Sequence, residues 1–355
     1  MPQASVDQPS ANSRYKSGLD GCPLMEGGVG RLFSTRQPSA NGITQSAIQS
    51  TNSYPTGCLI CGRNDGKVVW EGEEYSAKRT PCDLVYLDPM PLPDTIDLTQ
   101  DNHFEAYYVV ANDLRLDWVQ RFCSRGRMLE VGCGRGHLLA AARGRGFAVA
   151  GIEPHPECAR YARDRYGISV EQAFIEDSKF PASSFDVVFH VDLLSHFPDP
   201  VQALTAMSMR LRRGGHLCFE VGLLGGVAPW WYRIAGGIEA QHRWLFSETA
   251  LRGVLERAGL EVVAIRRFGL IPSFLPICLR RLFLSRIGRP LSPQPGQRRD
   301  FDERSVRHRI LGWLLVLLRY RLGRWVPRVG PLTLFVAARP TTNDNTDDEP
   351  CMSQE

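Results

Sequence analysis

Short apolar runs of the length of buried strands alternate with helix-forming segments along residues 101–340. Such alternation predicts strands joined by helices, and therefore a mainly parallel sheet covered on both faces. The pattern predicts strands at 127–131, 148–152, 169–173, 185–189, 216–221, 261–266 and 333–338, and helices at 104–122, 137–145, 156–166, 201–211 and 247–258. Ser247 is expected to cap the last of these helices, with Gly259 just beyond its end.

Four segments fall outside this pattern. Residues 1–50 and 341–355 are rich in polar residues and bury too little apolar area to offset their ordering entropy, so both are predicted to be disordered. Residues 51–100 form a small cysteine-containing lobe. Residues 268–330 are a basic, apolar insertion with a predicted helical character, placed before the last strand.

Composition narrows the class of protein. The 355 residues are 43% hydrophobic and 23% charged, as in a soluble globular protein, and the net charge of +4 gives no reason to expect nucleic acid as a partner. No apolar run reaches the roughly 18 residues needed to span a bilayer. No secretory signal begins the chain, and the cysteines fall mostly singly in apolar runs, so a cytoplasmic location is expected.

A glycine-rich loop follows the strand predicted at 127–131. Gly132, Gly134 and Gly136 permit left-handed backbone and close approach to a ligand, which should lie beyond the carboxyl end of the strand. The dinucleotide fingerprint GxGxxG would require glycine at position 137, which is His137. This counts against a nicotinamide dehydrogenase, which remains the alternative of different chemistry.

Glu153 closes the second strand, about twenty residues after Gly132. A carboxylate at this place can accept hydrogen bonds from both hydroxyls of an adenosine ribose. The structural alternative is a tight strand-to-helix turn followed by a surface glutamate. Glu153 in combination with the glycine loop favours a nucleoside-containing cofactor.

Several motifs together resemble class I S-adenosylmethionine (SAM)-dependent methyltransferases. They occur in the family's order: LEVGCGRG, GIEP, SSFDVVFHVDLLSHFPDP, LRRGGHLCFEV and HRWLFSETALRGVLERAGLEVV. The resemblance covers about residues 103–266. It implies a doubly wound, Rossmann-like α/β fold, with a seven-stranded sheet whose last strand is antiparallel.

The resemblance also implies roles for individual residues. The glycine loop would border the methionine part of SAM, Glu153 would hold the ribose, the stretch after the third strand would contact adenine, and the end of the fourth strand would lie beside the methyl group. The cofactor-binding residues implied are Glu130, Gly132, Gly134, Gly136, Glu153, Ile175, Glu176 (or its neighbour Asp177) and His190. The family often has a glutamate where this chain has Ser195, which puts in doubt any role that rests on that acid.

Methyl transfer needs alignment of the acceptor with the sulfur–methyl bond, and a hydroxyl acceptor also needs a base. Histidine suits this role because its ordinary pKa lies near cellular pH. His196, after the fourth strand, and His242, before the last helix, are the candidate catalytic residues. The alternative for each is a structural histidine bonded to backbone.

Cys58, Cys61 and Cys82 resemble the ligand set of the small zinc-ribbon lobes that precede some methyltransferase domains. A structural zinc site takes four ligands, often as two CxxC pairs, and the place of the fourth cysteine is occupied by Arg79. Zinc could bind with a ligand from elsewhere, or the lobe could keep its shape without metal.

The insertion at 268–330 holds apolar runs of nine to twelve residues flanked by arginines, with Trp313 and Trp325. Such runs suit an element lying at a membrane surface, on the inner face; a lid or a dimer element is the alternative. Trp230, Trp231 and Tyr232, which follow the fifth predicted strand, could line an acceptor pocket or pack a loop onto the core.

These features predict a methyltransferase that acts on oxygen or carbon of a hydrophobic or lipid-linked small molecule, similar to enzymes of quinone or lipid-linked glycan pathways. A methyltransferase of a soluble nucleotide sugar or metabolite is the second hypothesis. A non-catalytic, membrane-associated scaffold is the third, and the intact glycine loop and Glu153 argue against it.

Overall fold

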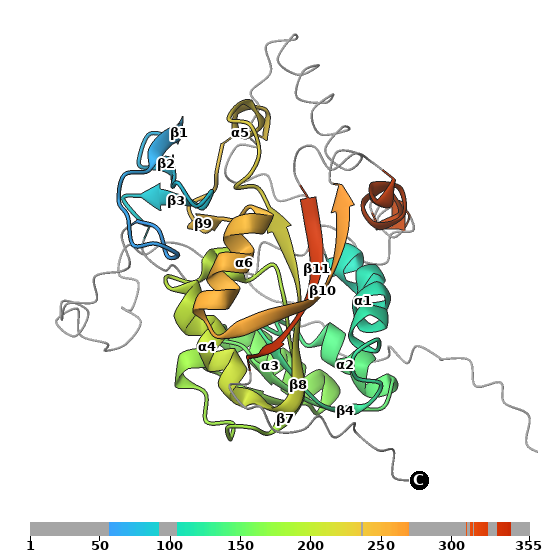
Figure 1. The fold of residues 1–355 in the computed structure, drawn as a ribbon. Helices are drawn as coiled ribbons and strands as arrows, with labels where there is room; N and C mark the ends of the chain where they lie inside the picture. The colour runs from blue at the N-terminus through green and yellow to red at the C-terminus, as the bar shows by residue number, and fades with distance from the viewer. Residues whose placement is uncertain are drawn as a thin grey trace, which may run out of the picture. The chain divides into compact units, whose positions relative to one another are not determined.

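The computed structural model describes residues 57–91, 105–235, 237–269, 310, 313–314, 316–325 and 332–341. Most of these residues surround a seven-stranded sheet of strand order β10-β11-β8-β7-β4-β5-β6 (Figure 1). The strands are β4 (Gly126–Val131), β5 (Phe147–Ile152), β6 (Ser169–Glu171), β7 (Phe185–Val191), β8 (Leu211–Leu223), β10 (Leu260–Gly269) and β11 (Leu332–Pro340). Every strand predicted from the sequence is present, and the predicted Rossmann-like topology is confirmed.

β11 is the one strand of this sheet that runs against its neighbours. It inserts between β10 and β8 and pairs antiparallel with both, whereas β4, β5, β6, β7 and β8 pair in parallel. Several predicted boundaries differ from the structure by two residues or more, including the ends of the first helix at Val119 and of β10 at Gly269. β8 begins at Leu211, not at residue 216, because the polar run Arg212–Gly215 disguises its first half, and β6 ends at Glu171, two residues early.

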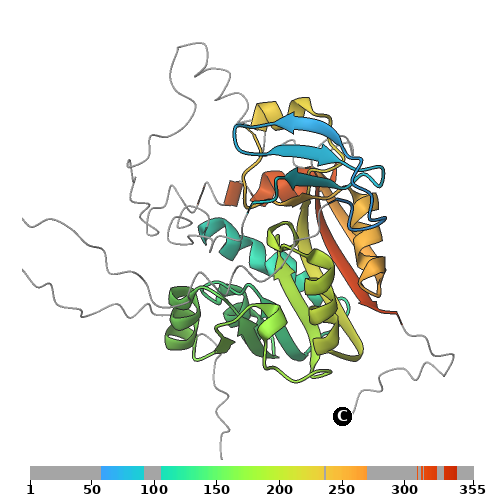
Figure 2. The ribbon, with the colours of Figure 1, turned by 90° about the vertical axis from the view of Figure 1, so that its left-hand side faces the viewer.

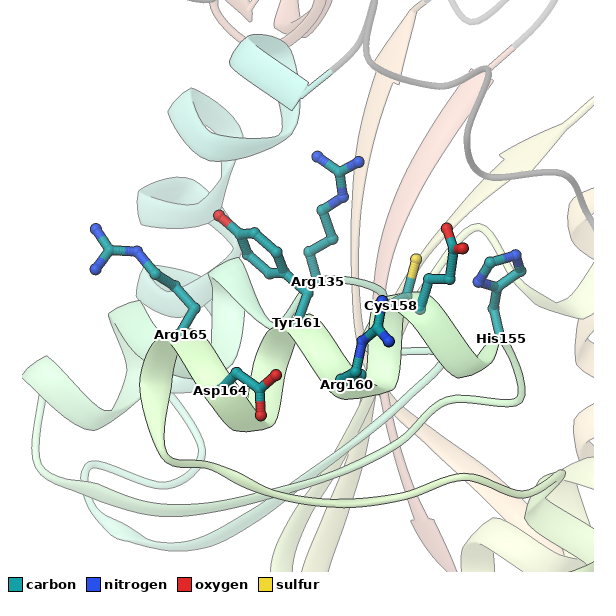
Figure 3. A pocket seen from close by; sticks show the side chains of 8 residues that line it. Arg135, His155, Cys158, Arg160, Tyr161, Asp164 and Arg165 are labelled. Atoms are coloured by element: carbon teal, nitrogen blue, oxygen red, sulfur yellow. The ribbon is translucent and has the colours of Figure 1, made fainter. Parts of the chain in front are cut away.

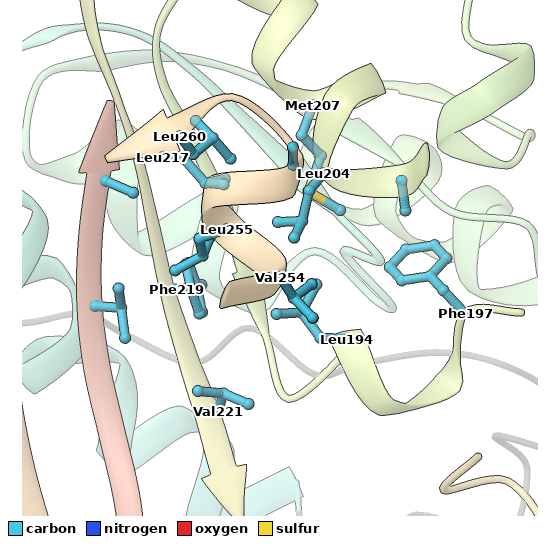
Figure 4. Packing of buried hydrophobic residues seen from close by; sticks show 14 of the residues in the cluster. Leu194, Phe197, Leu204, Met207, Leu217, Phe219, Val221, Val254, Leu255 and Leu260 are labelled. Carbon is cyan, nitrogen blue, oxygen red and sulfur yellow. The ribbon is translucent and has the colours of Figure 1, made fainter. Parts of the chain in front are cut away.

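Helices cover both faces of the sheet, as Figures 1 and 2 show. On one face, α1, α2 and α3 bury residues such as Trp118, Leu139 and Ala162 against the strands. On the other, α4 and α6 pack Leu204 and Val254 over β7 and β8, the cluster seen in Figure 4. The helices are α1 (Glu105–Val119), α2 (His137–Gly144), α3 (Pro156–Tyr166), α4 (Pro200–Arg210), α5 (Trp230–Ala235) and α6 (Glu248–Arg257).

The caps predicted for α6 are confirmed. The Ser247 hydroxyl accepts a hydrogen bond from the Ala250 amide at 3.0 Å, and Gly259 follows the helix with φ +70°. Asp199 caps α4 in the same way, accepting from the amides of Val201 and Gln202. Because these caps satisfy otherwise orphaned amides, they fix where α4 and α6 begin.

The cysteine-containing lobe forms a second, four-stranded sheet that includes a strand from the methyltransferase-like region. β1 (Lys67–Glu71), β2 (Ser76–Arg79) and β3 (Val85–Asp88) form an antiparallel meander. β3 also pairs with β9 (Trp244–Leu245), which lies between α5 and α6 in the chain. Residues 51–56 and 92–100 of the predicted lobe lie outside the described residues.

The remaining predicted segments are described in part or not at all. Residues 1–50 and 342–355 lie outside the described residues, as does most of the insertion. Of the insertion, the described part includes the helical turns η4 (Leu317–Arg321) and η5 (Leu322–Arg324). No helix among the described residues is long and apolar enough to cross a bilayer.

A buried ionic cluster joins the insertion to the sheet. The Glu220 carboxylate on β8 is 1% exposed and accepts hydrogen bonds from Arg115 Nε of α1 and from the Tyr320 hydroxyl, both at 2.7 Å. Arg319 lies 3.0 Å from the same carboxylate and also donates to the Thr333 hydroxyl. The two guanidinium groups hold the pKa of Glu220 below its usual range, although burial acts to raise it. The cluster thus fixes residues 319–320 to the carboxyl-end half of β8.

Replacing Glu220 tests this anchor. Glu220→Gln leaves the buried Arg115 and the partly buried Arg319 without their counter-charge, so we expect the free energy of unfolding to fall by about 3–5 kcal/mol in urea denaturation. Glu261→Gln is the matched control, because Glu261 pairs with Arg339 at the surface and should cost at most about 1 kcal/mol. Equal losses in the two variants would show that the buried cluster is not an anchor.

Candidate functional site

The strand order reverses direction between β4 and β7, and this switch point lies beside the glycine loop. Helices and loops leave opposite faces of the sheet there, so ligands of open α/β sheets bind at the carboxyl ends of the two strands. Residues 132–136 follow β4, and residues 192–196 follow β7. The loop is tied to the neighbouring strand by the amides of Gly132 and Cys133, which donate to the Ile152 carbonyl at 2.8 and 3.1 Å.

Glu153 connects the glycine loop to the end of β5. Its side chain is buried, and its two oxygens accept hydrogen bonds from the amides of Gly134 and His155, each at 2.8 Å. Burial raises the pKa of Glu153, while these two amides lower it. A carboxylate offers about four acceptor sites, so two remain for ligand hydroxyls. The surface-glutamate alternative is wrong, because Glu153 is 3% exposed.

Two glycines of the loop need to be glycine for different reasons. Gly134 has φ +51°, and a Cβ added there would meet no described atom within 4 Å, so its outer side faces open space. Gly136 has φ +76°, and a Cβ there would come within 2.9 Å of Ala162 Cβ on α3. Gly136 therefore lets α2 and α3 approach each other. Gly134 borders an open space among the described residues, which is called the crevice below.

Glu130 is a buried acid at the floor of this crevice. It lies on β4, is 5% exposed, and its Oε2 has no hydrogen-bond partner among the described residues. Burial raises the pKa of Glu130 well above its usual range, and the nearby Arg115 opposes this. A buried carboxyl with an unused oxygen is a fitting neighbour for a cationic ligand group.

The remaining predicted cofactor residues border the crevice in different ways. Ile175 is 1% exposed and packs in the core beneath η2 (Ile175–Asp177), whereas Glu176 on the same turn is exposed. His190 is fully buried and stacks on Phe219, with ring centroids 4.7 Å apart and planes 13° apart. Burial lowers the pKa of His190 to about 3, so its ring is neutral.

The two candidate catalytic histidines lie together. The rings of His196 and His242 are 4.8 Å apart between centroids, although 46 positions separate them in sequence. Burial, chiefly, and the positive charges of His242 and Arg243 lower the pKa of His196 to about 4, opposed by Asp192. Two histidines predicted separately therefore form one pair beside the end of β7.

Sequence reasoning missed two residues that support this pair. Ser195, judged only as a departure from the family pattern, has its hydroxyl 3.1 Å from His242 Nδ1. Arg243 is 4% exposed and is hydrogen-bonded to the backbone of Ser195, His196 and Leu87. Arg243 stands between His242 and the apolar run 244–246, and a charged residue in that place was the sequence signal that could have indicated a buried, hydrogen-bonded arginine.

The three predicted metal-binding cysteines also come together. The sulfur atoms of Cys58, Cys61 and Cys82 all lie within 4.8 Å of one another. The tight turn that presents them is closed by the Gly62 amide, which donates to the Cys58 carbonyl at 2.8 Å. The neighbouring cysteines raise the pKa of Cys82 to about 12. A divalent cation would reverse this, because it favours thiolates.

Arg79, which stands where a fourth cysteine would be expected, has a different role. Its guanidinium donates to the carbonyls of Gly225 and Val227, in the loop that follows β8. The Tyr232 hydroxyl donates to the Leu224 carbonyl in the same loop, and Tyr232 is 3% exposed. Tyr232 therefore packs the loop, whereas its neighbour Trp230 is half exposed.

A cavity of about 480 Å³ runs along α3 beside the crevice (Figure 3). His155, two residues after Glu153, lies at one end of it and Arg165 at the other, and the guanidinium of Arg135 from the glycine loop lies over the Tyr161 ring between them. Neither Gly134 nor Glu153 lines this cavity.

Comparison with known proteins identifies the central region. Residues 103–265 match a family described as "Methyltransferase domain". A stretch of 118 residues is 34% identical to the ubiquinone biosynthesis O-methyltransferase of Ralstonia nicotianae, covering 31% of this chain and 49% of that protein. The chain thus spans about half the length of the curated relative it matches.

Solved methyltransferases are similar at lower identity. A SAM-dependent methyltransferase of Thermotoga maritima, described as a possible histamine N-methyltransferase, is 22% identical, with a TM-score of 0.39 over 48% of this chain and 80% of that one. A Haemonchus contortus phosphoethanolamine N-methyltransferase 2, solved with S-adenosylhomocysteine, is 17% identical, with a TM-score of 0.43 over 69% and 59% of the two chains.

Proposed function

Since residues 103–265 are a methyltransferase domain of the class I SAM-dependent family, we propose that the whole chain transfers a methyl group from SAM to an oxygen or carbon of a hydrophobic or lipid-linked small molecule. The main support for SAM as the methyl donor is the open space over Gly134 next to the buried Glu153 carboxylate. The domain boundaries and the site residues are part of this proposal.

The residues of the crevice fit SAM in charge and shape. Glu130 offers a buried oxygen with no partner among the described residues, which suits the ammonium group of the methionine part. Glu153 has acceptor sites left for the two ribose hydroxyls. Gly132, Gly134 and Gly136 leave room for the backbone to approach, and Ile175 and Glu176 border the adenine.

When bound, SAM supplies a methyl group already activated by a sulfonium. The chain's own residues then have to align the acceptor and exclude water. His190 and Phe219 are both 0% exposed and stack behind the site, and because burial keeps the His190 ring neutral, it would not repel a sulfonium. For a hydroxyl acceptor, the His196–His242 pair is placed to accept the proton.

Exposed apolar residues support an acceptor of low polarity. Among the described part of the insertion, Ile310 and Trp313 are each 61% exposed and Trp325 is 85% exposed. Aromatic and aliphatic side chains near arginines suit a lipid surface. The relative from Ralstonia carries the name of a ubiquinone biosynthesis O-methyltransferase, which favours a quinone-like acceptor. We therefore expect a cytoplasmic protein that contacts the inner face of a membrane.

A soluble nucleotide sugar or other metabolite is the second candidate acceptor. It is favoured by the cavity along α3, where Arg135, Arg160 and Arg165 supply positive charge next to the crevice. A non-catalytic scaffold is disfavoured, since the loop and its Glu153 contacts are intact.

The cysteine cluster is proposed to hold zinc with a fourth ligand from outside the cluster. Three thiols within 4.8 Å fit zinc, for which bond lengths of about 2.3 Å give sulfur separations of roughly 3.8 Å. The ion would stabilise the turn at Cys58–Gly62 and the β2–β3 hairpin. Its role there would be structural.

The glycine loop is tested by a pair of matched variants. Gly134→Ala and Gly167→Ala both place a side chain at positive φ with no described atom within 4 Å, so both should lose about 1 kcal/mol of stability. Only Gly134 faces the crevice. We expect isothermal titration calorimetry to give a SAM dissociation constant weakened about tenfold or more for Gly134→Ala. Gly167→Ala, at the far end of α3, should bind SAM like the parent chain, and equal loss in both variants would contradict this site.

The acceptor is tested by labelled transfer. The full chain is incubated with methyl-labelled SAM and either the lipid fraction or the aqueous metabolite fraction of a bacterial extract, and products are sought by mass spectrometry. We expect one methyl to be gained by a compound of the lipid fraction. Label only in the aqueous fraction would favour the soluble acceptor, and label in neither would contradict an active enzyme.

The zinc proposal is tested by metal analysis of the purified chain. We expect about one zinc per chain, lost in Cys82→Ser together with a lower melting temperature, because metal binding contributes directly to the folding of such lobes. Cys123→Ser is the control, since Cys123 does not belong to the cluster. A parent chain without zinc, or a Cys82→Ser variant that keeps it, would refute the proposal.

A further inference from the structure

The histidine pair is assembled from two distant parts of the chain. His196 ends η3 (Leu194–His196) after β7, and His242 lies just before β9. Neither residue belongs to a long helix or strand that would fix its ring by itself. Some other contact must therefore hold the two loops together.

Arg243 makes contacts with both loops and with the cysteine lobe. Its amide donates to the Ser195 carbonyl at 2.9 Å, and its guanidinium donates to the His196 carbonyl at 2.7 Å and to the Pro91 carbonyl at 2.9 Å. Its own carbonyl accepts from the Leu87 amide of β3 at 3.0 Å. One buried residue thus links the turn of His196, the loop of His242 and the lobe.

The rings of His196 and His242 have different neighbours. The His242 ring meets the Ser195 hydroxyl through Nδ1 at 3.1 Å. The His196 ring lies beside the backbone of Gln241, and its Nδ1 is buried with no hydrogen-bond partner among the described residues. A neutral imidazole keeps a lone pair on one of its ring nitrogens, so His196 can accept a proton.

We propose that Arg243 is a positioning residue that clamps residues 195–196 to residues 241–243, so that the His196 ring is held beside His242 as the proton acceptor of the site. This inference rests on the proposed methyl transfer. As the acceptor oxygen forms its bond to the methyl carbon, the sulfur–carbon bond of the donor breaks to leave a neutral thioether, and the acceptor's proton passes to the His196 ring. Arg243 touches none of these atoms.

The charges around His196 are consistent with this role. Arg243 and His242 disfavour a positive charge on His196, while Asp192 favours one, and Glu239 lies 4.0 Å from His242 Nε2. The net result, with burial as the largest cause, keeps His196 neutral at pH 7, so its lone pair is available. After proton transfer, Asp192 is the nearby group that stabilises the imidazolium.

The test follows the two rings directly by NMR in the full chain labelled with [13Cε1]-histidine, titrated across about pH 4–8. His196→Gln and His242→Gln assign the two resonances. Arg243→Ala removes the clamp and its charge, Arg243→Lys keeps the charge and one contact, and Arg252→Ala is the control, a surface arginine paired with Glu248. Binding of S-adenosylhomocysteine is measured on each variant by calorimetry.

We expect Arg243→Ala to move the pKa of His196 toward its ordinary value of about 6.5, Arg243→Lys to give an intermediate value, and Arg252→Ala to leave it unchanged. Affinity for S-adenosylhomocysteine should stay within about twofold of the parent, because the clamp lies on the acceptor side. A folded Arg243→Ala variant with an unchanged His196 resonance would overturn the proposal.

A second variant keeps the test decisive if Arg243→Ala does not fold. In that case Arg243→Lys alone must shift the His196 titration, and a parent-like titration in the folded lysine variant overturns the proposal. A different result would refute the proposed function itself. If the parent chain does not bind S-adenosylhomocysteine at all, methyl transfer is refuted whatever the histidines do.

Discussion

The hydrogen bonds from the Gly134 and His155 amides to the Glu153 carboxylate are the contacts on which the site depends. They join the carboxyl ends of β4 and β5 through one buried charge. Because two backbone amides satisfy that charge, the acid stays in a nearly water-free position and the loop keeps its left-handed turns. The glycines permit the positive φ angles of the loop, and the hydrogen bond from Gly134 to Glu153 holds the loop in one conformation.

The cysteine lobe is part of the site's architecture and not an appendage. β9 completes its sheet, Arg79 binds the loop after β8, and the Leu87 amide binds Arg243 next to His242. All of these contacts are made with residues between β8 and α6, close to His242. If methyl transfer takes place as proposed, the lobe would shape the region around the histidine pair, while Glu153 holds the glycine loop.

Sequence reasoning located the sheet and the glycine loop because their signals are local. Gly132–Gly136 and Glu153 follow strands whose apolar pattern is unambiguous, and the parallel order brings the ends of those strands together. The roles of Arg243, Ser195 and β9 could not be predicted, because they depend on contacts between residues far apart in the sequence. Trp244–Leu245 is too short to show a strand period, and the Arg243 guanidinium binds Pro91, 152 positions away. The contact between Arg319 and Glu220 has the same long-range origin.

The most direct test of the account is a crystal structure of the full chain with S-adenosylhomocysteine bound. We expect the adenosine in the crevice beside Gly134, with its ribose hydroxyls on the Glu153 carboxylate. The amino group of the homocysteine part should lie toward Glu130. A ligand seated instead in the cavity along α3, or a crevice closed by the protein's own side chains, would contradict it.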